Sequence, residues 1–178
     1  MNHDTQLTFY VYNPHYNIEE IPKTPLLPVL LYHDPSKDTA SSKRSDITVE
    51  NLNRIISSLP EDSVLGVLSG VIVRDREFHL PIMDFACRES PENLAKIEQF
   101  LRILGHNKGV ILTSGRSYHY YGVGLMSEEQ WLSFLGDCGL SGLADPRYIF
   151  HRLKDICGIL RLSACPLRPK IPKVVSIL

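Results

Sequence analysis

Residues 110–125 read VILTSGRSYHYYGVGL. The apolar residues at the start of this stretch predict a strand, and the Ser-Gly pair that follows predicts a turn. After the turn, side-chain alternation predicts a second strand with Ser117, His119 and Tyr121 on one face. Strands joined by so short a turn pair antiparallel, so these residues predict a β-hairpin with a polar face.

Further elements follow from hydrophobic periodicity and from capping residues. Residues 36–46, SKDTASSKRSD, predict a loop, and the five prolines of residues 13–35 leave room for at most a short edge strand. The remaining patterns predict helices at 48–60, 90–105, 127–136 and 145–158, and strands at 7–12, 64–73, 77–86, 159–164 and 173–178. Helices alternating with pairs of neighbouring strands predict an α+β fold.

Length and composition exclude several classes of protein. The chain has 178 residues, 43% of them hydrophobic and 22% charged, as expected for a single globular domain. It has no run of 18 apolar residues, so no membrane span is expected, and its N-terminus lacks the pattern of a secretion signal. The four cysteines form no C-x-x-C pair and predict free thiols in a reducing cytoplasm.

Charge is distributed unevenly along the chain. Residues 147–178 hold seven Lys or Arg and one acid, a net charge of +6. The rest holds 12 basic and 19 acidic residues, a net charge of −7. This asymmetry indicates either a surface for an anionic partner or an ordinary solvated basic face.

Asp84 interrupts the apolar stretch HLPIMDFAC at residues 79–87. Alternation places it on the same strand face as Ile82 and Ala86. A carboxylate beside apolar neighbours requires a partner, which can be a hydrogen-bond donor, a cation or a metal ion. The structural alternative is a strand-terminal Asp that accepts hydrogen bonds from nearby backbone amides.

The turn of the predicted hairpin carries groups that suit a phosphate. Ser114, Gly115 and Arg116 offer a hydroxyl, backbone amides and a guanidinium, and His119 can donate to a phosphate oxygen. The structural alternative is a hairpin with a buried histidine and tyrosines at its edge.

The predicted helix at 145–158 places Ile149, Phe150, Leu153 and Ile156 towards the core. Asp155 lies in its last turn, where the helix dipole disfavours an anion, which indicates either a function or a pair with Arg152 at i, i+3. Beyond this helix, Arg161, Arg168, Lys170 and Lys173 lie in a proline-stiffened segment. They predict phosphate binding or, alternatively, a basic edge that prevents strand aggregation.

In their order along the chain, these features resemble the archaeo-eukaryotic primase superfamily over residues 64–178. Asp84 falls on the first acid of its Asp-x-Asp motif, and SGRSYHYYG at 114–122 is similar to its second motif. Asp155 and the following Arg161–Lys170 run are similar to its third. Ala86 stands where the family has its second motif I acid.

The resemblance implies an RRM-like, mainly antiparallel sheet with flanking helices, together with a small N-terminal α/β module. We expect one domain over residues 1–178, with the N-terminal module at 1–63 and the RRM-like module at 64–178. The implied activity is primase-type nucleotidyl transfer, in DNA replication or repair, with a nucleoside triphosphate, DNA or RNA, and a helicase or other replication partner.

The resemblance also implies a role for each site residue. Asp84 and Asp155 would hold Mg²⁺ or Mn²⁺, and together with His119 they would form the catalytic group. The implied nucleotide-binding residues are Ser114, Arg116, His119, Arg161 and Lys170, and the implied nucleic-acid contacts are Tyr121, Arg147, Arg168 and Lys173.

Two other functions fit the same residues. With a single acid in motif I, the chain can be a non-catalytic module that binds nucleotides or nucleic acid. It can also be a metal-dependent phosphohydrolase on an unrelated α+β fold, using Asp84, His119 and Asp155.

Overall fold

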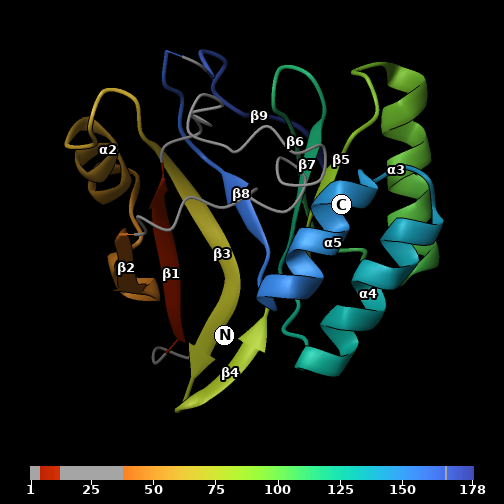
Figure 1. Cartoon of the computed structure of the whole chain (residues 1–178), viewed down its shortest axis with the longest axis horizontal. Coiled ribbons are helices and arrows are strands. Elements are labelled where there is room, and N and C mark those ends of the chain that lie inside the picture. Colours follow the sequence, from red (N-terminus) through yellow and green to blue (C-terminus); the bar gives the residue numbers. More distant parts are fainter. Residues whose placement is uncertain (1–4, 13–37, 167) are drawn as a thin grey trace, which may run out of the picture.

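A computed structural model of the chain describes residues 5–12, 38–166 and 168–178 (Figure 1). The proline-containing stretch 13–35, with the short edge strand predicted there, lies outside these residues. The elements in chain order are β1 (Thr5–Tyr12), β2 (Asp38–Lys43), the 3-10 turn η1 (Arg44–Asp46), α2 (Val49–Ser57), β3 (Val64–Val73), β4 (Arg76–His79), β5 (Ile82–Phe85), α3 (Pro91–Ile103), β6 (Gly109–Thr113), β7 (Tyr118–Gly122), α4 (Glu128–Leu140), α5 (Pro146–Asp155), β8 (Ile159–Arg161) and β9 (Lys173–Ile177).

The described strands form two antiparallel sheets, which confirms the α+β class. The first sheet has the order β2-β1-β3-β4, and β8 also pairs with β3. The second has the order β5-β7-β6-β9. Because β1 pairs with β3, strands from both sides of residue 63 lie in one sheet.

The predicted strand 77–86 is wrong as a single strand, because its two halves belong to different sheets. His79 at the end of β4 pairs with Gly70 of β3, whereas Ile82 at the start of β5 pairs with Tyr121 of β7. Pro81 lies between them, and a proline cannot donate to a strand ladder. This break carries Asp84 away from the β3–β4 hairpin and into the sheet that contains the β6–β7 hairpin.

The loop predicted at 36–46 is also wrong in part, because residues 38–43 form β2. Its backbone pairs with β1 from Gln6↔Lys43 to Val11↔Asp38. β2 lies at the edge of its sheet, where a polar sequence is tolerated because one side of the strand faces no partner strand. Pairing with β1 therefore overrides the turn-like composition.

Two hydrophobic clusters hold the sheets and helices together. The larger one joins the second sheet to α3, α4 and α5 through residues such as Met83, Phe85, Ile97 and Trp131. The smaller one lies between the first sheet and α2. Figure 1 shows α3 and α4 beyond the second sheet and α2 at the opposite side of the molecule. Among the described residues, no helix is long and apolar enough to cross a membrane.

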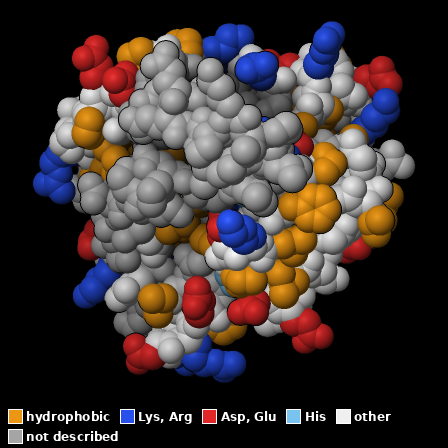
Figure 2. Space-filling view, viewed as in Figure 1, with side chains coloured by type: hydrophobic (Ala, Val, Ile, Leu, Met, Phe, Trp, Pro, Cys, Tyr) orange, Lys and Arg blue, Asp and Glu red, His pale blue; other side chains and the backbone are white. Residues whose placement is uncertain are grey.

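The core-facing side of α5 differs from the prediction. Tyr148, Ile149 and Arg152 are buried, whereas Phe150 is 69% exposed. Figure 2 shows hydrophobic side chains on the surface to the right of centre, where Figure 1 places α5. The helix turns this way because the Arg152 guanidinium packs over the Tyr148 ring, 5.3 Å from its centroid, and the Tyr148 hydroxyl reaches the backbone of β8.

Candidate functional site

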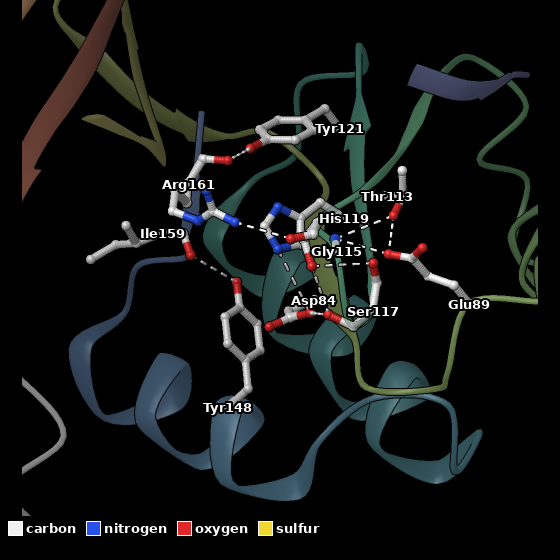
Figure 3. Close-up of polar contacts among 11 residues, drawn as sticks. Asp84, Glu89, Thr113, Gly115, Ser117, His119, Tyr121, Tyr148, Ile159 and Arg161 are labelled. Atoms are coloured by element: carbon white, nitrogen blue, oxygen red, sulfur yellow. Dashed lines mark hydrogen bonds and ion pairs between the residues drawn. The ribbon is translucent and has the colours of Figure 1, made fainter. Parts of the chain in front are cut away.

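The polar centre of the second sheet lies where β5 meets β7. In this ladder Asp84 is directly opposite His119. The Ser117 hydroxyl donates to Asp84 Oδ1 at 3.1 Å, and His119 Nε2 lies 3.9 Å from the same oxygen (Figure 3). The predicted alternation of β7 is therefore confirmed, since Ser117 and His119 share the face that Asp84 also occupies.

The opposite face of β7 belongs to the core. Tyr118 and Tyr120 are buried in the larger hydrophobic cluster. The Tyr118 hydroxyl donates to the Ser90 carbonyl and accepts from the Ser90 amide, so it fixes the loop before α3. Burial raises the pKa of Tyr120 to about 12. These two tyrosines stabilise the fold, and the polar face of the strand is left to His119 and its neighbours.

His119 is the most deeply placed titratable group of this face, with 6% of its surface exposed. Burial lowers its pKa and the charge of Arg161 adds to this shift, while the Asp84 carboxylate and the Arg161 backbone act against it. Its Nδ1 atom has no hydrogen-bond partner among the described residues. A buried polar atom without a partner costs free energy, so this nitrogen is a feature of the site that requires an explanation.

The turn between β6 and β7 depends on glycine. Gly115 has a φ of +94°, a conformation that other residues rarely adopt. A Cβ atom on Gly115 would lie 2.3 Å from Lys170 Cδ, because the Lys170 side chain packs on the turn. Lys170 Nζ also donates to the Gly115 carbonyl at 3.2 Å. The turn and the C-terminal segment are thus held together at this residue.

Arg161 supports the turn from the interior. Its buried guanidinium donates to the backbone carbonyls of Ser163 at 2.6 Å, Lys170 at 2.8 Å and Ser114 at 3.1 Å. Burial lowers its pKa. An arginine nevertheless stays protonated in proteins, so the turn has a fixed positive charge behind it. The Tyr121 hydroxyl donates to the Arg161 carbonyl at 3.1 Å, which joins β7 to the end of β8.

Exposed cations surround the same turn. Arg116 lies in the turn itself, and Lys173 of β9 is paired with Thr113 of β6. Together with Lys170 they give this end of the sheet a positive rim. Of the other predicted nucleic-acid contacts, Arg168 lies near the site, because the Arg161 guanidinium reaches its carbonyl at 3.5 Å, whereas Arg147 is exposed in the first turn of α5.

Asp155 is engaged on its own helix. Its carboxylate lies 3.4 Å from the guanidinium of Arg152, which is 2% exposed and needs a counter-ion. This is the i, i+3 pair that the sequence offered as the structural alternative. The contacts described here thus join Asp84, Ser117 and His119 and back them with Arg161, whereas Asp155 is held by α5.

The residues of the site do not fit a two-cation centre. Such a centre requires several carboxylates around cations about 3.5–4 Å apart. The face of β5 and β7 offers Asp84 alone, because Ala86 stands at the position of the second acid and the Glu89 carboxylate is bonded to Thr113 and Gly115 at the turn. In the described part of the chain, no group of three or more His, Cys, Asp or Glu side chains could hold a metal ion.

Three further residues belong to this site although the sequence did not assign them a role. Ser117 was recognisable from alternation alone, since it precedes His119 by two positions. Glu89 and Thr113 were not recognisable, because they meet only in the folded chain: the Glu89 carboxylate accepts hydrogen bonds from the Thr113 hydroxyl and, at 2.8 Å, from the Gly115 amide.

The sequence pattern of the archaeo-eukaryotic primase 1D-like family matches residues 43–173. The match covers most of the chain, from the end of β2 to the start of β9, and it includes the site described above. The chain therefore belongs to this primase-like family, whose domains are generally metal-dependent. No match was found among the curated proteins or among the solved structures.

Proposed function

We propose that this chain binds a nucleoside triphosphate at the face of Asp84, Ser117 and His119, with the phosphates on the adjoining turn. The observation that carries the proposal is the buried, unpaired Nδ1 atom of His119 beside a glycine turn backed by Arg161. A polyphosphate supplies the acceptor oxygens and the negative charge that these groups lack.

Each residue of the proposed site has a separate task. His119 donates to a phosphate oxygen, while Ser114, Arg116 and Lys170 grip the phosphates at the surface of the turn. Arg161 contributes its charge from behind, and its hydrogen bonds to backbone carbonyls hold the turn in position.

A nucleic-acid strand is the proposed second ligand. Lys173, Arg168 and Arg147 are exposed and would contact its phosphates, and such contacts weaken as salt rises. Tyr121 would contribute its ring, which lies 6.5 Å from the His119 ring, while its hydroxyl is already bonded to the chain. DNA and RNA offer the same phosphate chemistry to these groups. A helicase partner remains a prediction from the resemblance alone.

The donor set favours binding over nucleotidyl transfer. A transferase of this family would align the attacking and leaving oxygens with metal ions, and the face of Asp84 and His119 offers only one carboxylate for them. A phosphohydrolase built from Asp84, His119 and Asp155 is not favoured either, because Arg152 engages Asp155. We therefore propose a nucleotide-binding member of the family.

The test is isothermal titration of the full chain with ATP in Mg²⁺ buffer. We expect His119→Gln and Lys170→Ala each to weaken binding about 10-fold, the effect of one lost polar contact. Lys96→Ala is the matched control, because this exposed lysine pairs with Glu92 on α3, away from the turn. Equal affinity in all four proteins would contradict the proposed site.

Primer extension with Mn²⁺ and deoxynucleotides separates binding from transfer. We expect no extension product above background. Extension that Asp84→Ala abolishes would show that the chain is a polymerase after all.

A further inference from the structure

Glu89 lies in the loop between β5 and α3, outside the motifs that the resemblance identified. Its Oε1 atom accepts a hydrogen bond from the Gly115 amide at 2.8 Å and another from the Thr113 hydroxyl (Figure 3). The Gly115 amide also reaches Thr113 Oγ1 at 3.2 Å. One carboxylate oxygen thus occupies two hydrogen-bond donors of the turn on which we place the phosphates.

A carboxylate oxygen and a phosphate oxygen form the same kind of hydrogen bond with these donors. Both are anionic acceptors, and both form short, charge-assisted hydrogen bonds with amides and hydroxyls. We infer that Glu89 is an internal competitor for the phosphate position at Gly115 and Thr113, so that a nucleotide binds there only after the Glu89 side chain has left. This inference rests on the proposed function and adds the regulation of the same site.

The structure allows Glu89 to leave without a change in the backbone. The residues on both sides are anchored: the Ser90 amide donates to the Tyr118 hydroxyl at 2.8 Å, and the Asn93 side chain donates to the Arg88 carbonyl at 2.9 Å. The Glu89 side chain itself is exposed. Rotation about its side-chain bonds is therefore enough to open the turn, while the loop stays in place.

The displaced Glu89 carboxylate would be hydrated by solvent, whereas the phosphates would accept hydrogen bonds from donors that Glu89 does not contact. His119 and Lys170 lie on the other sides of the turn, as described above. A ligand with several phosphates can contact them in addition to Gly115 and Thr113. A single phosphate makes fewer contacts, so it compensates less of the free energy needed to displace the Glu89 carboxylate. Glu89 thus selects a polyphosphate over inorganic phosphate.

The experiment compares ATP, inorganic tripolyphosphate and inorganic phosphate by isothermal titration with the full-length chain. Glu89→Gln keeps the size of the side chain and removes its charge, and Glu89→Ala removes the competing group. Because the apparent affinity scales with the open fraction of a site, we expect both variants to bind ATP and tripolyphosphate roughly 5–30-fold more tightly. Inorganic phosphate should gain measurably in Glu89→Ala.

Glu92→Gln is the matched control. This carboxylate lies three residues further on in α3, is exposed, and pairs with Lys96 at 2.7 Å, so the substitution removes one negative charge, as Glu89→Gln does, without opening the turn. We expect its ATP affinity to stay within about 2-fold of the wild type, since screened surface charges contribute little. An increase equal to that of Glu89→Gln would overturn the inference in favour of a general charge effect.

The remaining outcomes separate the inference from the proposed function. ATP binding that depends on His119 but is unchanged or weaker in Glu89→Gln would overturn the inference and leave the function standing. No binding by the wild type together with clear binding by Glu89→Gln would support both. Failure of both proteins to bind either polyphosphate would overturn both, because removing the competitor must reveal the site.

Discussion

At the scale of single residues, several side chains of the site hold the backbone of the turn in place by hydrogen bonds and packing, in addition to any contact with a ligand. The buried guanidinium of Arg161 bonds to carbonyls of three different segments, and Lys170 packs on Gly115. A phosphate-binding turn requires amides in a fixed direction, so the groups that hold the turn are as important as those that touch the ligand.

Gly115→Ala tests how far the turn depends on this packing. We expect the variant to lose about 1–2 kcal/mol of unfolding free energy, because alanine at a φ of +94° is strained and its Cβ would displace Lys170. Urea unfolding measures this loss, and titration with ATP should show weaker binding as well.

Gly136→Ala is the control for that substitution. Gly136 lies inside α4, and a Cβ atom there would meet no neighbouring atom. We expect this variant to gain up to about 1 kcal/mol, since alanine is the better helix former, and to bind ATP as the wild type does. Equal stability losses in the two variants would contradict a special role for the Gly115 turn.

At the scale of elements, a buried polar contact around Ser69 of β3 joins the first sheet to α4 and to the turn before β8. Its hydroxyl accepts from the Gly158 amide at 2.8 Å and lies 3.1 Å from His79 Nδ1. The His79 ring stacks on Trp131 of α4 at a centroid distance of 4.6 Å. One side chain thus links β3, β4, α4 and the turn between α5 and β8.

Ser69→Ala should therefore destabilise the whole domain. The substitution leaves the buried Gly158 amide without its acceptor, which costs about 1–3 kcal/mol. We expect a lower urea midpoint with an unchanged denaturant slope, measured by circular dichroism. Ser45→Ala, at an exposed serine of η1, should change the unfolding free energy by less than about 0.5 kcal/mol. Similar losses in the two variants would show that the Ser69 contact does not stabilise the domain.

The sequence predicts the first residues of the helices better than their last residues. The helices predicted to start at residues 48, 90 and 127 have Thr48, Ser90 and Ser127 as N-caps, and each of these side chains accepts the backbone N–H three residues later. The predicted end of the third helix at Gly136 is wrong, because α4 continues to Leu140. An N-cap is a hydrogen bond within one turn of the chain, so neighbouring residues are enough to predict it. A glycine inside a helical pattern only weakens the helix, and packing against other elements decides whether the helix ends there.

At the scale of the whole molecule, buried histidines make stability depend on pH. Burial lowers the pKa of His79, with Glu77 and Glu128 acting against it, and it also lowers the pKa of His106 and His119. Since the folded pKa lies below the unfolded value of about 6.5, the unfolded chain binds more protons in this range. The stabilisation is complete above the unfolded pKa and is lost as the pH falls through it.

We therefore expect the unfolding free energy to fall by roughly 1–3 kcal/mol between pH 7.5 and pH 5.5. Urea titrations at the two pH values measure the change, and His119→Gln should reduce it, because one of the contributing groups is gone. This window lies above the range in which the carboxylates Glu50 and Glu92, whose pKa values are lowered, take up protons. A stability that is flat or rises towards pH 5.5 would contradict the assignment.

Periodicity and capping were enough to predict the α+β class, the hairpin of β6 and β7, and the shared face of Ser117 and His119. These features depend on the fixed geometry of a strand or a helical turn, which is written in neighbouring residues. The same local signals placed Asp84 on a strand, although they gave no sign of which sheet that strand joins.

Folding alone set the long-range partners. The break at Pro81 moves Asp84 opposite His119, Glu89 meets the turn at Gly115, and the Arg161 guanidinium reaches the Ser114 carbonyl. Such contacts depend on how whole elements pack, and many chains with the same local pattern could pack differently. The residue types therefore predict the chemistry of this site. Which of these groups lie close together, and which are already bonded to one another, depends on the packing of the two sheets and can be seen only in the tertiary structure.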